Sequence, residues 1–66
     1  MKLIKKLFGI KTTYAIPSDN GVDITKGKKY ILNDGVFIKD DVGVRLFINK
    51  TNCKHINGGS WQIIIG

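Results

Sequence analysis

Asp23-Ile24-Thr25-Lys26-Gly27-Lys28-Lys29-Tyr30-Ile31-Leu32 is the stretch that decides the fold, because a polar turn closed by a glycine runs directly into a β-type strand. Asn33-Asp34-Gly35 then reverses the chain, and Asp40-Asp41-Val42-Gly43 reverses it again. Asn and Asp tolerate left-handed backbone angles, and glycine adopts them without a Cβ clash. The pattern therefore predicts three short antiparallel strands in sequence, over residues 28–32, 36–39 and 44–49.

Two further strands are expected outside this meander. One covers residues 13–16, where Tyr14, Ala15 and Ile16 are followed by Pro17, which cannot donate to a sheet ladder. Residues 61–65 are rich in β-branched side chains and follow a polar connector over residues 51–60. Alternation along the five strands, with Ile24 from the long loop, predicts a core of Tyr14, Ile16, Ile24, Ile31, Ile38, Val44, Leu46, Ile48, Trp61 and Ile63.

Five short strands, a long loop after the first and tight turns in the middle resemble a small SH3-like β-barrel over residues 10–66. The phrases Ile24-Thr25-Lys26-Gly27-Lys28-Lys29-Tyr30 and Asp40-Asp41-Val42-Gly43 also look like small phage-encoded proteins of this barrel type. The resemblance covers about residues 14–65 and its motifs are structural. An OB-like barrel, which also has five strands, is the alternative fold.

SH3 domains bind proline-rich ligands in a groove lined by aromatic side chains, next to a long acidic loop. The corresponding loop here, residues 17–27, has only Asp19 and Asp23 as acids and contains no aromatic side chain. Polyproline binding is therefore not expected, although the architecture is similar.

Residues 1–9 are predicted to form a short amphipathic helix, separate from the barrel. At about 100° per residue, the apolar side chains fall within one arc of a helix and the lysines fall opposite. Two turns of helix do not hold in water alone, so this segment must dock. As a helix, the segment would either cover an open end of the barrel or bind a membrane surface or another chain. The third possibility is that the segment forms a strand. The docking residues would be Leu3, Ile4, Leu7 and Phe8.

The chain has 66 residues and a net charge of +6, from eleven Lys and Arg against five Asp. This length allows one small core, and the charge favours anionic partners. The lone cysteine suits a reducing compartment, and no stretch approaches the roughly 20 apolar residues of a membrane span. The expected location is the cytoplasm, that of the host if the chain is phage-encoded. Peripheral membrane contact is disfavoured, and self-association stays open.

The residues with reactive side chains do not form a catalytic or metal-binding set. Cys53 and His55 lie two positions apart, but a third residue to orient the imidazole is lacking, and zinc needs three or four ligands. Cys53 is better explained as a small buried apolar residue. Asp40 and Asp41 precede a glycine and are typical turn residues. We expect neither an enzyme nor a cofactor.

Two functions fit these residues. The first is a non-enzymatic interaction module, in which a small phage protein binds and modulates a host bacterial protein whose contact surface could be acidic. The second is a basic barrel that binds nucleic acid through phosphate contacts, with an exposed aromatic ring stacking on a base. The candidate binding residues for either are Lys26, Lys28, Lys29, Arg45, Phe47 and Lys50.

Overall fold

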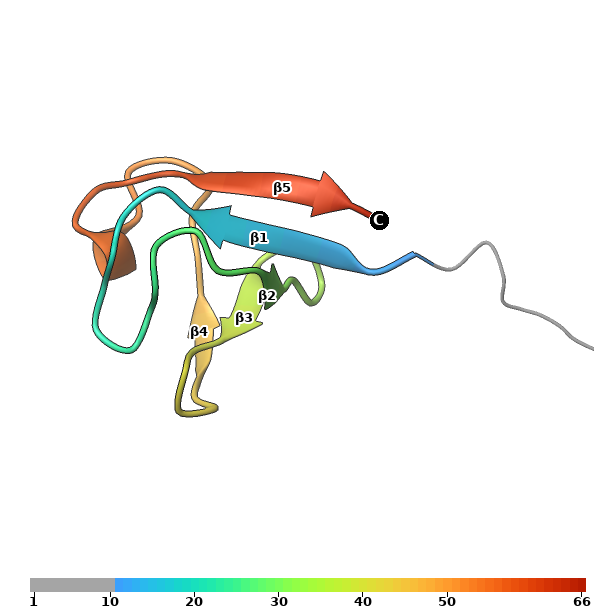
Figure 1. The fold of residues 1–66 in the computed structure, drawn as a ribbon, viewed down its shortest axis with the longest axis horizontal. Helices are drawn as coiled ribbons and strands as arrows, with labels where there is room; N and C mark the ends of the chain where they lie inside the picture. Colours follow the sequence, from blue (N-terminus) through green and yellow to red (C-terminus); the bar gives the residue numbers. More distant parts are fainter. Residues whose placement is uncertain (1–10) are drawn as a thin grey trace, which may run out of the picture.

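The computed structural model describes residues 11–66 (Figure 1). The predicted helix over residues 1–9 lies outside the described residues. The described chain contains five strands and one short 3-10 turn, so the mainly β prediction is confirmed. The elements are β1 (Thr13–Pro17), β2 (Tyr30–Ile31), β3 (Phe37–Lys39), β4 (Arg45–Phe47), η1 (Lys54–Ile56) and β5 (Trp61–Ile65).

The strands form two open sheets, so the prediction of a closed SH3-like barrel is wrong. One antiparallel sheet has the order β2-β1-β5 and the other pairs β3 with β4. A closed barrel requires an unbroken ladder from each strand to the next. Here β2 is only two residues long, and between β2 and β3 the ladder is reduced to one isolated bridge, from Asn33 to Phe37.

The core lies between the two sheets and the loops that cross their ends. Its buried apolar side chains are Ala15, Ile24, Tyr30, Leu32, Ile38, Ile48, Cys53, Ile56 and Trp61. Four predicted core residues are buried as expected, namely Ile24, Ile38, Ile48 and Trp61. Leu46 and Ile63 are half-buried and pack against this cluster. The interpretation of Cys53 as a small buried residue is confirmed.

Two strands face the opposite way from the prediction. In β1, Ala15 is buried while Tyr14 and Ile16 are only half-buried. After it, Tyr30 and Leu32 are buried while Ile31 is 55% exposed. Both segments carry apolar side chains on both faces. Alternation alone therefore did not show which face points to the core, because a shift of one residue exchanges the two faces.

Val44 was also placed in the predicted core, but its side chain is 52% exposed. Val44 directly follows the turn residue Gly43 and precedes β4, which begins at Arg45. It therefore lies at the turn between β3 and β4 and outside the buried cluster.

The two predicted tight turns form as expected. Asp34 and Gly35 both have positive φ, at 55° and 73°, the left-handed angles that Asp and Gly tolerate in turns. At the second turn the Asp40 carboxylate accepts the amides of Val42 and Val44.

Candidate binding face

The side chains that point away from the core include apolar, aromatic and basic residues from all five strands. Ile31, Tyr14 and Ile64 are direct neighbours across the three-stranded sheet. The bridge from Asn33 to Phe37 continues that side onto the second sheet, where Phe37 pairs with Phe47. Since paired residues share a face, these side chains lie on the sides of the two sheets that point away from the core, and the two rows meet at the bridge. We call these outward sides the outer face, and its residues are Tyr14, Ile16, Lys29, Ile31, Asn33, Phe37, Lys39, Arg45, Phe47, Gln62 and Ile64.

Cations lie over the aromatic rings of this face. The Lys29 ammonium lies 5.2 Å from the centre of the Tyr14 ring. The Arg45 guanidinium lies 4.0 Å from the centre of the Phe37 ring, which in turn meets Phe47 edge to face. A cation within about 6 Å of a ring centre is attracted by the ring's negative face. These contacts hold the basic groups among apolar surface.

A hollow of about 440 Å³ lies between β2 and β3, where the ladder between the strands is broken. Its lining combines three lysines with two aspartates and a few less polar groups, namely Lys28, Lys29, Tyr30, Ile31, Asn33, Lys39, Asp40 and Asp41. Lys28 and Lys29 were expected to point to opposite sides, because they were assigned to a strand. The Lys28 amide instead closes a turn with the Thr25 carbonyl, so strand alternation begins only at Tyr30.

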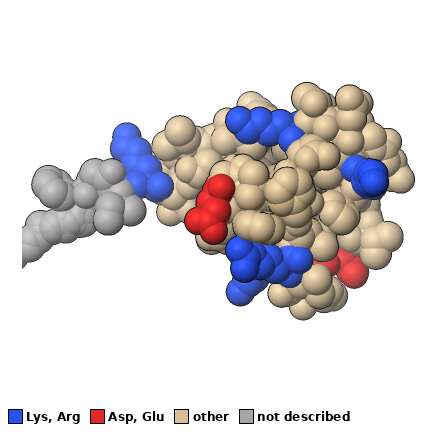
Figure 2. All heavy atoms as spheres, turned by 180° about the vertical axis from the view of Figure 1, so that it is seen from behind, with Lys and Arg blue, Asp and Glu red and all other residues tan. Residues whose placement is uncertain are grey.

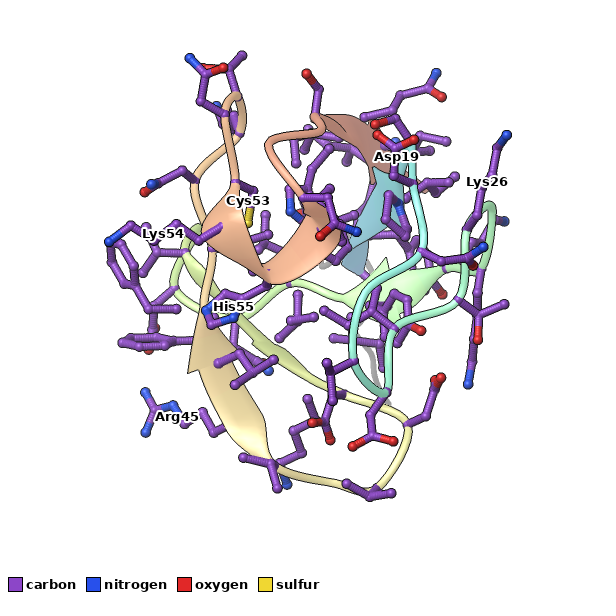
Figure 3. All side chains as sticks on the ribbon, turned by 90° about the vertical axis from the view of Figure 1, so that its left-hand side faces the viewer. Asp19, Lys26, Arg45, Cys53, Lys54 and His55 are labelled. Atoms are coloured by element: carbon purple, nitrogen blue, oxygen red, sulfur yellow. The ribbon has the colours of Figure 1, made fainter. Side chains whose placement is uncertain are left out.

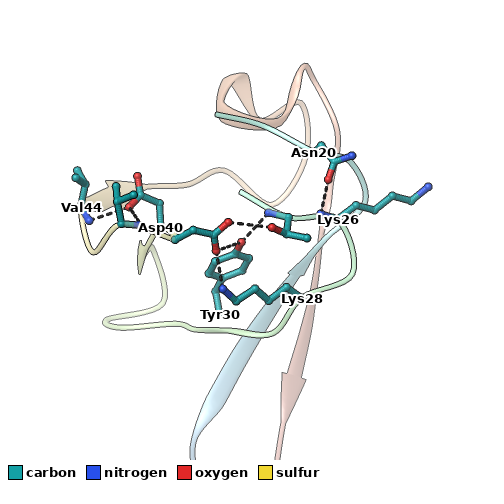
Figure 4. Close-up of polar contacts among 9 residues, drawn as sticks. Asn20, Lys26, Lys28, Tyr30, Asp40 and Val44 are labelled. Atoms are coloured by element: carbon teal, nitrogen blue, oxygen red, sulfur yellow. Dashed lines mark hydrogen bonds and ion pairs between the residues drawn. The ribbon is translucent and has the colours of Figure 1, made fainter. Parts of the chain in front are cut away.

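Asp41 lies in one wall of this hollow, and its polar contacts with Lys28 and Tyr30 are among those drawn in Figure 4. Its carboxylate accepts hydrogen bonds from the Lys28 ammonium at 2.6 Å, the Tyr30 hydroxyl at 2.8 Å and the Thr25 hydroxyl at 2.9 Å. The Tyr30 hydroxyl also accepts the Thr25 amide at 2.7 Å. The network ties the long loop after β1 to the turn between β3 and β4, two segments that no ladder connects.

The network changes the proton affinities of its members. The Lys28 ammonium, followed by the Tyr30 hydroxyl, lowers the pKa of the Asp41 carboxyl below its usual 3.8. The same hydrogen bond raises the pKa of Lys28 above 10.5. Burial, before any other cause, raises the pKa of Tyr30. Lys28 is therefore held as a partner of Asp41 across the neutral range.

We expect acid to remove the contribution of Asp41 to stability. Because its pKa is lower in the folded chain, this contribution is fully present above the unfolded value of 3.8 and is lost as the pH falls through the folded value. Urea unfolding at several pH values should show Asp41→Asn less stable than wild type at pH 7, with the difference closing below about pH 3.8.

Asp34→Asn is the matched control, because Asp34 is 78% exposed and its ion pair with Arg45, the only one it makes within residues 11–66, spans 3.9 Å. Its stability should match that of wild type at pH 7, as expected for an exposed pair. A difference between wild type and Asp41→Asn that persists unchanged at low pH would contradict the role given to this carboxylate.

The outer face includes three of the six predicted binding residues, which are Lys29 on one sheet and Arg45 and Phe47 on the other. Lys28 borders the hollow but is paired with Asp41. Lys26 extends away on the opposite side from Arg45, as Figure 3 shows, and Lys50 lies in the connector beyond β4. The candidate residues Leu3, Ile4, Leu7 and Phe8 lie outside the described residues. Sequence reasoning missed Tyr14, Ile31 and Phe37, because the first two were assigned to the core.

Cys53 and His55 do not form a reactive pair. Cys53 is buried beside the 3-10 turn, whereas His55 is exposed (Figure 3). Within residues 11–66, no three His, Cys, Asp or Glu side chains come close enough to hold a metal ion. The same part of the chain has no helix long and apolar enough to cross a membrane.

Basic side chains are dispersed over the surface that Figure 2 shows. Lys and Arg appear there in separate groups with acidic side chains between them, not in one continuous band. A backbone-tracking nucleic-acid groove needs a connected row of cations. The side of the molecule that Figure 2 shows does not provide such a row.

Comparisons with protein-family models, with curated proteins and with solved structures found no match to this chain.

Proposed function

We propose that the chain is a non-enzymatic interaction module whose outer face binds an acidic and partly apolar surface of another protein. The observation that carries this proposal is that Tyr14, Ile31, Phe37 and Phe47 all point away from the core, with cations over the rings of Tyr14 and Phe37. Aromatic residues and arginine are the residue types enriched where proteins bind one another. Apolar side chains exposed together on a small chain call for a partner.

The hollow between β2 and β3 adds a place for negative charge. Lys29 and Lys39 line it, while Lys28 on its wall already neutralises Asp41. An acidic side chain of the partner would meet these ammonium groups, and its apolar neighbours would contact Ile31 and Phe37. The resemblance to small phage proteins supports a bacterial host protein as this partner.

Single-stranded nucleic acid is the second candidate, and one observation favours it. Phe47 is 55% exposed and lies on the same strand as Arg45, so its ring could accept a stacked base. The rings of Tyr14 and Phe37 each already have a cation over one side. Together with the dispersed charge, this leaves the protein partner as the better-supported function.

Phe47→Ser tests the proposal in a retention assay on nuclease-treated bacterial lysate. Truncating a central aromatic side chain costs about 2 kcal/mol of binding, roughly a thirtyfold loss. We expect the immobilised full-length wild type to retain a protein that Phe47→Ser does not retain. Val22→Ser is the control, because Val22 is 86% exposed but borders a different hollow.

Equal retention by wild type and Phe47→Ser would contradict the assignment to the outer face. Retention of a protein from untreated lysate that is lost after nuclease treatment would favour the nucleic-acid function. A salt titration with a mixed-sequence oligonucleotide would then measure that binding, since phosphate binding weakens steeply with salt.

A further inference from the structure

The side of β5 that faces away from β1 is a free sheet edge over its second half. β5 is the outer strand in the order β2-β1-β5, and Figure 1 shows no other described strand beside it there. Natural sheets protect such edges with charged residues, proline, bulges or covering segments. β5 reads Trp61-Gln62-Ile63-Ile64-Ile65 and contains no charge, although the whole chain carries +6.

The register of β1 and β5 shows which backbone groups point outward. Ser18 bonds Ser60 and Gly66 bonds Thr12 through the backbone, and hydrogen-bonded pairs alternate with non-bonded pairs in an antiparallel ladder. The amides and carbonyls of Trp61, Ile63 and Ile65 therefore point away from β1. The Trp61 amide donates to the Lys50 carbonyl. Those of Ile63 and Ile65 have no backbone partner among residues 11–66.

We propose that two copies of this chain associate by antiparallel pairing of their β5 edges. In a two-fold arrangement, Ile63 of one copy faces Ile65 of the other, and Ile64 faces its own counterpart at the axis. The outward groups of Ile63 and Ile65 then exchange hydrogen bonds with the same groups of the second copy. The neighbouring register, with Ile63 opposite itself, would require the Trp61 amide, which Lys50 already occupies.

The side chains of this edge fit the same arrangement. Ile65 is 68% exposed and would be covered by Ile63 of the second copy on the inner side of the sheet. On the outer face, the two Ile64 side chains would meet at a non-bonded pair, where side chains approach most closely. The row Ile31, Tyr14 and Ile64 would thus continue across the axis into the second copy. Association would join two three-stranded sheets into one.

Ile65→Lys and Val22→Lys test this pairing, with sedimentation equilibrium of the full chain at increasing concentration. Both replace an exposed apolar residue by the same charge, but only Ile65 lies on the edge. We expect a reversible dimer for wild type, an approximately tenfold or greater weakening for Ile65→Lys, and no change for Val22→Lys. If Ile65→Lys fails to fold, Ile65→Pro replaces it, since proline is tolerated where the amide faces outward.

Amide hydrogen exchange identifies the surface that pairs. In wild type, protection of the Ile63 and Ile65 amides from exchange should rise with protein concentration. In Ile65→Lys, protection of the Ile63 amide should not change with concentration. A chain that stays monomeric up to millimolar concentration would overturn the proposal. So would a dimer that Ile65→Lys does not weaken, or Ile63 and Ile65 amides that exchange slowly in dilute monomer, which would mean that another part of the same chain covers the edge.

Discussion

Gly21→Ala is expected to destabilise the chain more than an alanine at any glycine with free space around it. A Cβ at this position would meet the backbone carbonyl oxygen of His55, with the Ile56 side chain 3.3 Å away. A backbone group cannot rotate aside as a side chain can, so the loop and the 3-10 turn would have to separate. The cost of such overpacking is about 3 kcal/mol or more. Thermal unfolding of the variant beside wild type measures it.

Gly66→Ala is the matched control, because no atom of the described residues beyond its chain neighbour would lie within 4 Å of an added Cβ. Its unfolding midpoint should equal that of wild type. If Gly21→Ala also unfolded at the wild-type midpoint, the close packing of residues 18–27 against the 3-10 turn would be contradicted.

Ile56→Ala should produce the other large loss of stability. Ile56 belongs to the short turn η1, yet its side chain is fully buried in the core. Truncating a buried isoleucine costs about 2–5 kcal/mol. A 66-residue chain has a total stability of roughly 3–10 kcal/mol, so this variant should be close to unfolded at room temperature. Urea unfolding followed by tryptophan fluorescence measures the loss, because Trp61 lies in the same cluster.

Ile31→Ala is the control for Ile56→Ala and also tests the register of β2. Ile31 is 55% exposed, so its truncation should change the free energy of unfolding by about 0.5 kcal/mol or less. A larger loss for Ile31→Ala than for Ile56→Ala would mean that β2 faces the other way, as alternation along the sequence had suggested.

The strands that sequence predicts best are those whose two faces differ in polarity or whose ends carry clear turn residues. Residues 61–65 follow Gly58-Gly59-Ser60, and β5 has the predicted bounds. The face shared by Leu46 and Ile48 was also correct, because Arg45 and Asn49 are polar on the other side. The positive φ values of Asp34 and Gly43 follow directly from the turn motifs.

The features that sequence missed depend on contacts between distant segments. Whether Tyr30 or Ile31 turns inward is decided by packing, because both are apolar. The burial of Ile56 follows from the 3-10 turn folding back onto the loop at Gly21. Closure of the barrel depends on ladder length between β2 and β3, which short strands do not reveal in advance.

The candidate site was predicted in part for the same reason. Lys29, Arg45 and Phe47 were recognised from charge and alternation. Tyr14 and Ile31 were missed because a register displaced by one residue moved them into the expected core. Pairing of Lys28 with Asp41 joins residues 13 positions apart and has no local sequence signal.

The most direct measurement of the binding role is a nuclear magnetic resonance titration of the isotope-labelled full chain with the protein that wild type retains. A parallel titration uses a mixed-sequence single-stranded oligonucleotide at physiological salt. We expect the protein to shift the amide signals of Tyr14, Ile31, Phe37 and Phe47, and the oligonucleotide to give no saturable change. Protein-induced shifts centred on Val22 and Asn57, or saturable binding of the oligonucleotide at the outer face, would contradict the proposed function.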